Sequence, residues 1–168
     1  MTRSEILKAL GDKFPGVEIK EDDTNPEALI VPADNLVELA SHLKDDPALS
    51  FKYNMVITAA DWVEHVDVIY YFMSYEHGHT VALKVQLPNE RMKVHTLAGV
   101  WRSANWFERE VYDLFGVIFE GHPDLRRIMM PADWDGHPLR KGYQHPNFVP
   151  LPGKDNPASK TGMGHHTI

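Results

Sequence analysis

Charged side chains are densest between Trp106 and Arg127, where the chain reads WFEREVYDLFGVIFEGHPDLRR. Carboxylates beside an arginine can perform acid–base catalysis, and two adjacent arginines can bind a carboxylate or phosphate through paired hydrogen bonds. Alternatively, these charges pair with one another or with a partner and hold structure together. The eight candidate residues are Glu108, Arg109, Glu110, Asp113, His122, Asp124, Arg126 and Arg127.

Their spacing favours bracing over catalysis. A helix is predicted over residues 106–115, and Arg109 and Asp113 stand four residues apart on it, so we expect them to pair along the helix. The adjacent Arg126 and Arg127 are predicted to reach an acid of this helix, or acids of a partner, rather than a free anion. The acids of the helix are Glu108, Glu110 and Asp113.

Other kinds of active site find little support. The chain has no cysteine, which removes disulfides, thiolate metal sites and a cysteine nucleophile. It also lacks GxGxxG, GxxxxGK[ST], GxSxG and HExxH. We therefore predict no catalytic, cofactor-binding or metal site in this chain. The ten histidines are His42, His65, His77, His79, His95, His122, His137, His145, His165 and His166.

The net charge of −7 is unevenly distributed. Residues 1–75 hold 14 acidic and 6 basic side chains, whereas residues 76–168 hold 10 and 11. An acidic front half argues against nucleic acid, because phosphate backbones favour clustered Lys and Arg. No window approaches the roughly 18 apolar residues of a membrane span, and the first residues lack the core of a signal peptide. We therefore expect membrane association only through a protein partner.

Helices and strands are predicted along the first 120 residues. Helical spacing of apolar residues marks residues 3–14 and a segment that Asp34 can cap, and alternation marks the strand at 80–87. Helices are also predicted at 94–101 and 106–115; Asn105 and Glu108 are spaced as a capping box, and Gly116 would end the second helix. The remaining predicted strands are 17–21, 28–31, 51–59 and 66–75.

The amino-acid composition changes at residue 121. Seven of the twelve prolines follow it, which excludes long helices and central strands. Apolar and aromatic residues such as Met129, Trp134 and Leu139 are also present, and disordered segments are poor in these. The sequence thus predicts an α+β protein. Residues 1–120 would form a small mixed or antiparallel sheet with flanking helices, and residues 121–168 an extended, irregular arm that binds a partner.

The residues on both sides of this boundary resemble a known family. The runs WFERE, YDLFGV and GHPDLRRI are similar to the signature of the thirty-kilodalton subunit, also called the C subunit, of respiratory complex I, the NADH-quinone oxidoreductase. PADW and GHPLRK resemble its continuation. The resemblance is strongest from residue 101 to residue 143 and weaker before it, where only the order of elements agrees.

The resemblance implies a non-catalytic, peripheral subunit of a proton-translocating complex. It implies docking on the forty-nine-kilodalton-type D subunit, next to the iron–sulfur B subunit, at the cytoplasmic side of the bacterial inner membrane. FMN, iron–sulfur clusters, NADH and quinone would belong to the parent complex, with none bound by this chain. The eight candidate residues would then brace the contact between subunits through ion pairs and hydrogen bonds.

Three rival interpretations remain open. The equivalent subunit of a membrane-bound [NiFe] hydrogenase or formate hydrogenlyase-type complex shares the signature. A free-standing small enzyme could use Glu108, Glu110 and Arg126 on an anionic substrate. A free interaction module would bind a partner without any respiratory role.

Overall fold

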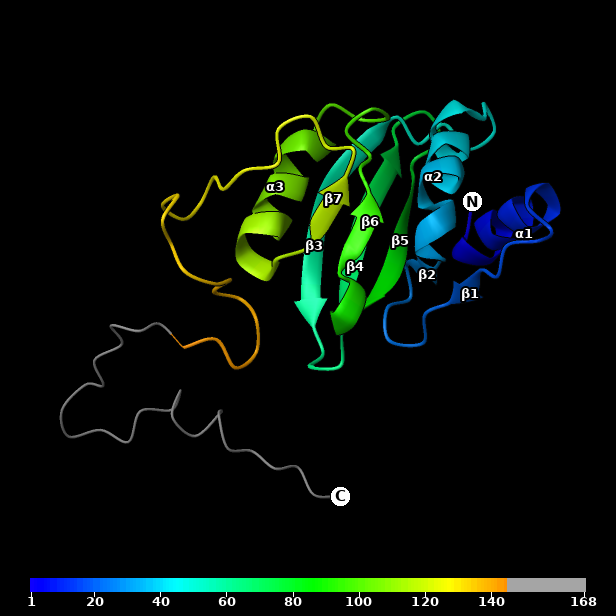
Figure 1. Cartoon of the computed structure of the whole chain (residues 1–168). Helices are drawn as coiled ribbons and strands as arrows, with labels where there is room; N and C mark the ends of the chain where they lie inside the picture. The colour runs from blue at the N-terminus through cyan, green and yellow to red at the C-terminus, as the bar shows by residue number, and fades with distance from the viewer. Residues whose placement is uncertain (145–168) are drawn as a thin grey trace, which may run out of the picture.

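The segments predicted as strands assemble into one five-stranded sheet in the order β1-β2-β5-β4-β3 (Figure 1). The computed structural model describes residues 1–144. Strands β2 and β5 run parallel, and the other neighbours run antiparallel, so the sheet is mixed and the predicted α+β class is confirmed. The strands are β1 (Lys20–Glu21), β2 (Ala28–Ile30), β3 (Tyr53–Asp61), β4 (His65–Ser74) and β5 (His79–Pro88).

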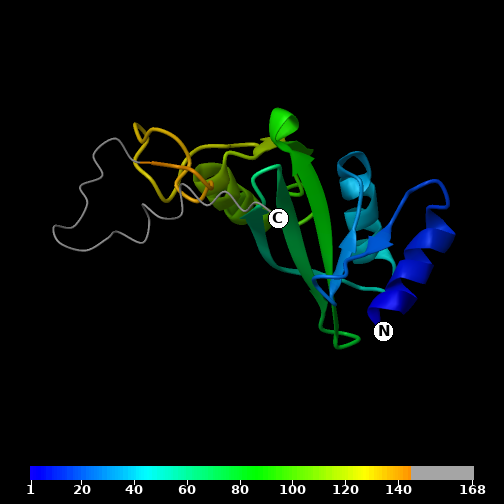
Figure 2. The same ribbon diagram turned by 90° about the horizontal axis from the view of Figure 1, so that it is seen from below.

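The alternation of the long strands places one set of side chains in the core. Ile57, Tyr70 and Leu83 stand opposite one another on β3, β4 and β5, and all three are buried. Helices α2 (Leu36–Asp45) and α3 (Ala104–Phe115) cover this face, while α1 (Arg3–Lys13) lies at the β1–β2 end (Figures 1 and 2). The chain thus forms one apolar core between the helices and a single sheet face.

The segment before α3 differs from its prediction. Instead of a helix over residues 94–101, the structure has the short strand β6 (Lys93–His95), followed by turns. Strand β6 pairs in parallel with β7 (Ile118–Glu120), which was not predicted, and Val94 and Phe119 meet in the core. This pairing joins the chain before α3 to the chain after it, a long-range contact that outweighs the local helical spacing.

Helix ends were predicted with mixed success. The capping box at Asn105 and Glu108 is wrong, because Ser103 precedes α3 without a side-chain cap and Glu108 points inward. Asp34 does not cap α2 either, since it lies in η1 (Ala33–Asn35) just before that helix. The end at Gly116 is confirmed by its left-handed φ of +83°. The remaining short helix is η2 (Asn89–Arg91).

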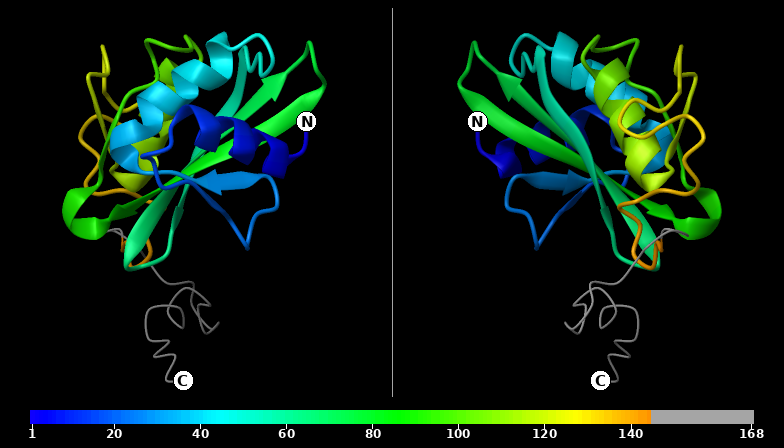
Figure 3. Two further views of the ribbon diagram at one scale, coloured as in Figure 1. Left: turned by 90° about the vertical axis from the view of Figure 1, so that its right-hand side faces the viewer. Right: turned by 90° about the vertical axis from the view of Figure 1, so that its left-hand side faces the viewer.

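The arm, residues 121–168, is described as far as residue 144, and that part contains no helix or strand. It follows α3 from one end to the other: His122 Nε2 lies 3.0 Å from the carbonyl oxygen of Asn105, and the Leu139 amide donates to the carbonyl of Leu114. In Figure 3 this segment lies beside α3 in both views. Residues 145–168, including His145, His165 and His166, lie outside the described residues, and the boundary at residue 120 stays a prediction.

Candidate functional site

Asp113 is the centre of the contact between α3 and the arm. Its carboxylate is fully buried, and Oδ2 accepts hydrogen bonds from the backbone amides of Ile128, Met129 and Met130 at 2.7–2.9 Å. Oδ1 lies 2.6 Å from a guanidinium nitrogen of Arg127. Burial alone would raise the pKa of Asp113, but the hydrogen bonds from the Met130 amide and Arg127 outweigh it, so the pKa lies below its ordinary value.

Arg127 extends this contact to the far side of the arm. One of its guanidinium nitrogens donates to the carbonyls of Trp134 and Gly136 at 3.0 and 2.8 Å, while the other donates to the Asp113 carbonyl at 3.0 Å. His137 lies close by, with Nδ1 2.9 Å from the same Asp113 carbonyl. Arg127 therefore binds an acid of α3 as predicted. Its bonds to the Trp134 and Gly136 carbonyls close a loop of the arm around the Arg127 side chain.

Glu108 is a buried carboxylate one turn earlier on α3. It has no exposed surface and accepts hydrogen bonds from the Thr96 hydroxyl and, at 2.6 Å, from the Leu97 amide. Burial raises its pKa to about 7 despite these two donors. His122, also buried, has its Nε2 4.0 Å from the carboxylate. Its Nδ1 accepts from the Asp124 amide, so Nε2 carries the proton and faces Asn105. Glu108 therefore ties α3 to the turn after β6.

Arg109 does not pair with Asp113 along the helix as predicted. Its Nε donates to the Arg126 carbonyl at 3.3 Å, a terminal nitrogen lies 3.8 Å from the Asp124 carboxylate, and its guanidinium covers the Trp106 ring at 4.8 Å. The prediction failed because helical spacing shows which side chains can meet but not which partner another segment brings nearer.

The other three candidate residues are exposed. Arg126 and Asp124 form an ion pair at 2.9 Å and keep 68% and 52% of their side-chain surface in solvent. Arg126 therefore pairs within the arm and not with an acid of α3. Glu110 is exposed on α3 and pairs with no residue of the stretch from 1 to 144. The structure thus divides the eight into a buried set that makes contacts within this chain and an exposed set of Glu110, Asp124 and Arg126.

A second carboxylate, Asp61, holds the other end of the described arm. It accepts from the Lys141 amide at 2.8 Å and lies 3.1 Å from Nε of Arg140. Arg140 also donates to Asn89 Oδ1 at 2.7 Å. Sequence reasoning missed Asp61 because an aspartate at a strand end carries no signal of a partner 80 residues away. The GHPLRK run that contains Arg140 was the available hint.

A buried ionic cluster on the opposite face of the sheet was also missed. Lys84 lies between the carboxylates of Asp22 and Asp67, and all three are nearly inaccessible to solvent. Asp67 also accepts from the Trp62 indole at 2.8 Å. Its charges are satisfied within the chain, so we assign it to the structure of the sheet.

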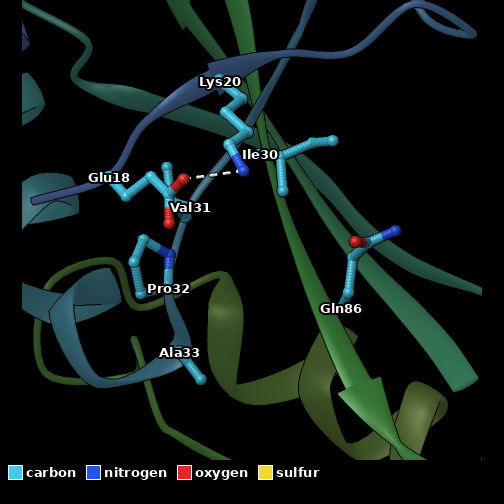
Figure 4. A pocket seen from close by; sticks show the side chains of 7 residues that line it. All are labelled: Glu18, Lys20, Ile30, Val31, Pro32, Ala33 and Gln86. Carbon is cyan, nitrogen blue, oxygen red and sulfur yellow. Dashed lines mark ion pairs between the residues drawn. The ribbon is translucent and has the colours of Figure 1, made fainter.

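A shallow pocket of about 220 Å³ lies at the β1–β2 side of the sheet (Figure 4). It is lined by Glu18, Lys20, Ile30, Val31, Pro32, Ala33 and Gln86, and none of these is a candidate residue. Glu18 and Lys20 form an exposed ion pair at its rim. The pocket therefore does not coincide with the contact between α3 and the arm.

Histidines and carboxylates do not gather into a metal-binding group within the described residues. Between residues 1 and 144, no three His, Asp or Glu side chains are arranged as metal ligands would be. His77, in the β4–β5 turn, and His79, the first residue of β5, stack on each other and contact the carbonyls of Pro47 and Leu49. Over the same residues, no helix has the length and apolar character needed to cross a bilayer.

Solved structures of the same fold include the two chains described next. The trypsin-resistant fragment of Nqo5 aligns with a TM-score of 0.60 and 32% identity over 74% of this chain and all of that fragment. A chain of the membrane-bound sulfane sulfur reductase, an archaeal respiratory membrane complex, aligns with a TM-score of 0.69 and 27% identity. That match covers 84% of this chain and 85% of the other.

Sequence comparison gives the family. The model of the respiratory-chain NADH dehydrogenase 30 kDa subunit matches residues 29–149. The NADH-quinone oxidoreductase C subunit of Chlorobium phaeobacteroides is 39% identical over 83% of this chain and 84% of that protein. The protein of that name from Paramagnetospirillum magneticum is 37% identical over 87% and 73%. The NADH-quinone oxidoreductase C subunit of Methylobacterium sp. is 40% identical over 72% of this chain, and the match spans 57% of that protein's length. The chain therefore belongs to the 30 kDa subunit family of the respiratory-chain NADH dehydrogenases.

Proposed function

We propose that the chain is a non-catalytic, peripheral subunit of an NADH-quinone oxidoreductase. In this role it braces the quinone-reducing module by docking on the forty-nine-kilodalton-type D subunit, next to the iron–sulfur B subunit. The observation that carries the proposal is the binding of the arm by Asp113. Three backbone amides and one guanidinium converge on a single buried carboxylate, which fixes the described part of the arm in one shape before any partner arrives.

The fixed arm presents apolar side chains outward. Met129 is 60% exposed and Leu139 is 52% exposed, and Trp106 of α3 is 61% exposed over Arg109. Aromatic, methionine and arginine side chains are enriched in protein interfaces. The exposed charges of Glu110, Asp124 and Arg126 would form the polar rim of such a contact. The buried residues of the eight act from inside this chain: Glu108, Arg109, Asp113, His122 and Arg127.

The parent complex would supply the redox chemistry. FMN, iron–sulfur clusters, NADH and quinone would be bound by other subunits, and proton translocation would be a property of the whole assembly. This chain would reach the membrane only through those subunits, on the cytoplasmic side of the inner membrane. The alternative of a free-standing enzyme needs Glu108 to contact a substrate. Glu108 is fully buried, so it has no surface with which to do so.

A second candidate function has a specific observation in its favour. The fold match to a chain of the sulfane sulfur reductase complex shows that this architecture also occurs in a respiratory membrane complex with another substrate. This match supports membership of a complex that does not oxidise NADH, and the alternative of that kind is an equivalent subunit of a [NiFe] hydrogenase or formate hydrogenlyase-type complex. Metal analysis of the purified assembly separates them, because nickel would identify the alternative and NADH oxidation the first candidate.

The test is capture of the tagged chain from its native membranes, followed by mass spectrometry. We expect the D and B subunits in the capture. Arg127→Ala should reduce the amount of the D subunit by about tenfold or more, because the arm loses its shape. Arg126→Ala should reduce it less, since only the rim changes.

Lys20→Ala is the matched control for Arg126→Ala. Lys20 is likewise an exposed cation in a surface ion pair, with Glu18 at 2.7 Å, but it lies on β1, at the opposite end of the sheet from β3. The control should capture as much of the D subunit as the wild type. If Arg127→Ala captures as much as Lys20→Ala, the arm does not mediate docking and the proposal is wrong.

A further inference from the structure

Strand β3 forms one margin of the five-stranded sheet. Along residues 1–144 it pairs with β4 on one side, and no strand pairs with its other side. A nine-residue strand at an edge leaves a row of backbone N–H and C=O groups without sheet partners. Its regular part runs from Val56 to Asp61, after a bulge between Asn54 and Val56.

Proteins usually protect such an edge with Lys, Pro, a charged residue or a very short strand. In β3, whose sequence is YNMVITAAD, the only charged residue is the final Asp61, and there is neither Lys nor Pro. The bulge disturbs only the first residues of the strand. The segment from Val56 to Ala60 is therefore uncharged and regular, and can pair with another chain.

Exposed apolar side chains gather around this edge. Tyr53 and Met55 at the start of β3 are 45% and 41% exposed, and Trp62 and Val63 directly after its end are also exposed. The arm reaches the same end of the strand, where the Lys141 amide binds Asp61. In the right-hand view of Figure 3, β3 lies beside α3 and the arm on the side of the molecule that faces the viewer. A molecule bound to the arm would therefore be next to the β3 edge.

We propose that a β-strand of the partner subunit that binds the arm pairs with the free edge of β3 and extends this sheet. The inference rests on the proposed function, because the arm and the edge lie on one side of the chain and would share one partner. Main-chain hydrogen bonds would supply affinity and fix the register, as in other cases of strand addition. The added strand needs small or apolar residues next to Ile57 and Ala59, on the face that packs toward the core.

Thr58→Lys tests the edge. Thr58 is exposed on the sheet face away from the helices, so the variant should fold, while a lysine on an edge strand opposes pairing. Gln86→Lys places the same charge at an exposed position on the same face, but on β5, which β4 separates from the free edge of β3. In membrane capture, we expect Thr58→Lys to lower the amount of the D subunit by about tenfold and Gln86→Lys to leave it within about twofold.

Hydrogen exchange supplies a second measurement. In the wild-type complex, every second amide between Val56 and Ala60 should exchange about a hundredfold more slowly than in the free chain, because only the amides that point away from β4 gain partners. The amides already bonded to β4 should change little.

The outcomes are distinct. Unchanged capture by Thr58→Lys together with unprotected β3 amides in an intact complex would overturn the inference and leave the proposed function standing. Equal losses in both lysine variants would place the contact on the open sheet face, and alternate protection in the free chain would mean that the edge is covered without the partner; either result overturns it. Absence of any other subunit from wild-type capture would reject the proposed function and this inference together.

Discussion

The sheet domain and the arm are held in place by different forces. The domain buries an apolar cluster that includes Tyr70, Phe72 and Leu83, none of which has exposed surface. The described arm contributes only the half-buried Leu125 to the apolar side chains packed against that cluster, and its contacts converge on Asp113 and Asp61. Many weak apolar contacts fix the first region, and a few strong polar ones fix the second.

This difference has a consequence for stability. Loss of one apolar side chain removes only a fraction of the apolar contacts that stabilise the domain. Loss of the Asp113 carboxylate removes the main attachment of the arm. An unpaired buried donor is also costly, because its hydrogen bond to water was given up on folding. The arm should therefore be freed by single polar substitutions that leave the sheet folded.

The largest expected effect is that of Asp113→Ala. It leaves the guanidinium of Arg127 without its carboxylate and three amides without acceptors, which should cost about 3–5 kcal/mol of unfolding free energy. We expect limited proteolysis to cut between residues 121 and 144 while the domain survives. Urea denaturation measures the free energy, and the protease pattern locates the damage.

Phe72→Ala is the comparison from the other region. Phe72 is fully buried and stacks on Trp101 at 4.5 Å, so its loss should cost a similar 3–5 kcal/mol or so. This loss should appear as global unfolding, without selective cleavage of the arm. If Asp113→Ala also destabilises the whole domain with no early cut in the arm, the two regions form one cooperative unit.

Glu108→Gln should change the pH dependence of stability. The pKa of Glu108 rises from 4.5 to about 7 on folding, so the folded state binds the proton more tightly and this group's contribution falls as pH rises through that range. The loss approaches about 3 kcal/mol above pH 7. Asp113 has the opposite sign, since its lowered pKa gives stability that is lost as pH falls.

The measurement compares unfolding free energies of wild type and Glu108→Gln at pH 5 and pH 8. The unfolding free energy of the variant should rise relative to that of the wild type as pH rises, because glutamine does not titrate. Parallel curves would mean that Glu108 does not keep its proton in the folded protein.

Gly116→Ala should have a moderate effect at the end of α3. Its φ of +83° costs roughly 1–2 kcal/mol for a residue with a Cβ. The new methyl group would also lie 2.7 Å from the ring of His137, so the arm must shift. Gly78→Ala is the control, because its φ is +65° but nothing lies within 4 Å. Equal thermal shifts in the two variants would exclude a contribution from the arm.

The smallest effect on stability is expected for Arg126→Ala. Its ion pair with Asp124 is solvent-exposed, and such pairs contribute little to folding. The urea midpoint should match that of the wild type, in contrast to Arg127→Ala, whose side chain is mostly buried and makes four hydrogen bonds. A clearly lower urea midpoint for Arg126→Ala would mean that the exposed residues also hold the arm in place.

Much of the fold was predictable from residue patterns. The alternation of apolar residues from Val81 to Leu87 predicted the central strand, β5. Gly116 predicted the end of α3, where the structure shows a left-handed conformation. The predicted helix over residues 94–101 failed because β6 pairs with β7, a segment that follows only after the whole of α3. Of the charged residues, the bond between Arg127 and an acid of α3 was predicted, whereas the partners of Arg109 and the role of Asp61 were not.

By itself the sequence determined the α+β class and the concentration of charge in and after α3, because both follow from residue type and spacing within a single element. Its runs of motif residues also carried the family resemblance. Only the tertiary structure decided which charges face inward. Glu108 and Asp113 are matched largely by backbone amides of other segments, and every residue except proline carries such an amide, so no residue type marks the partner in advance.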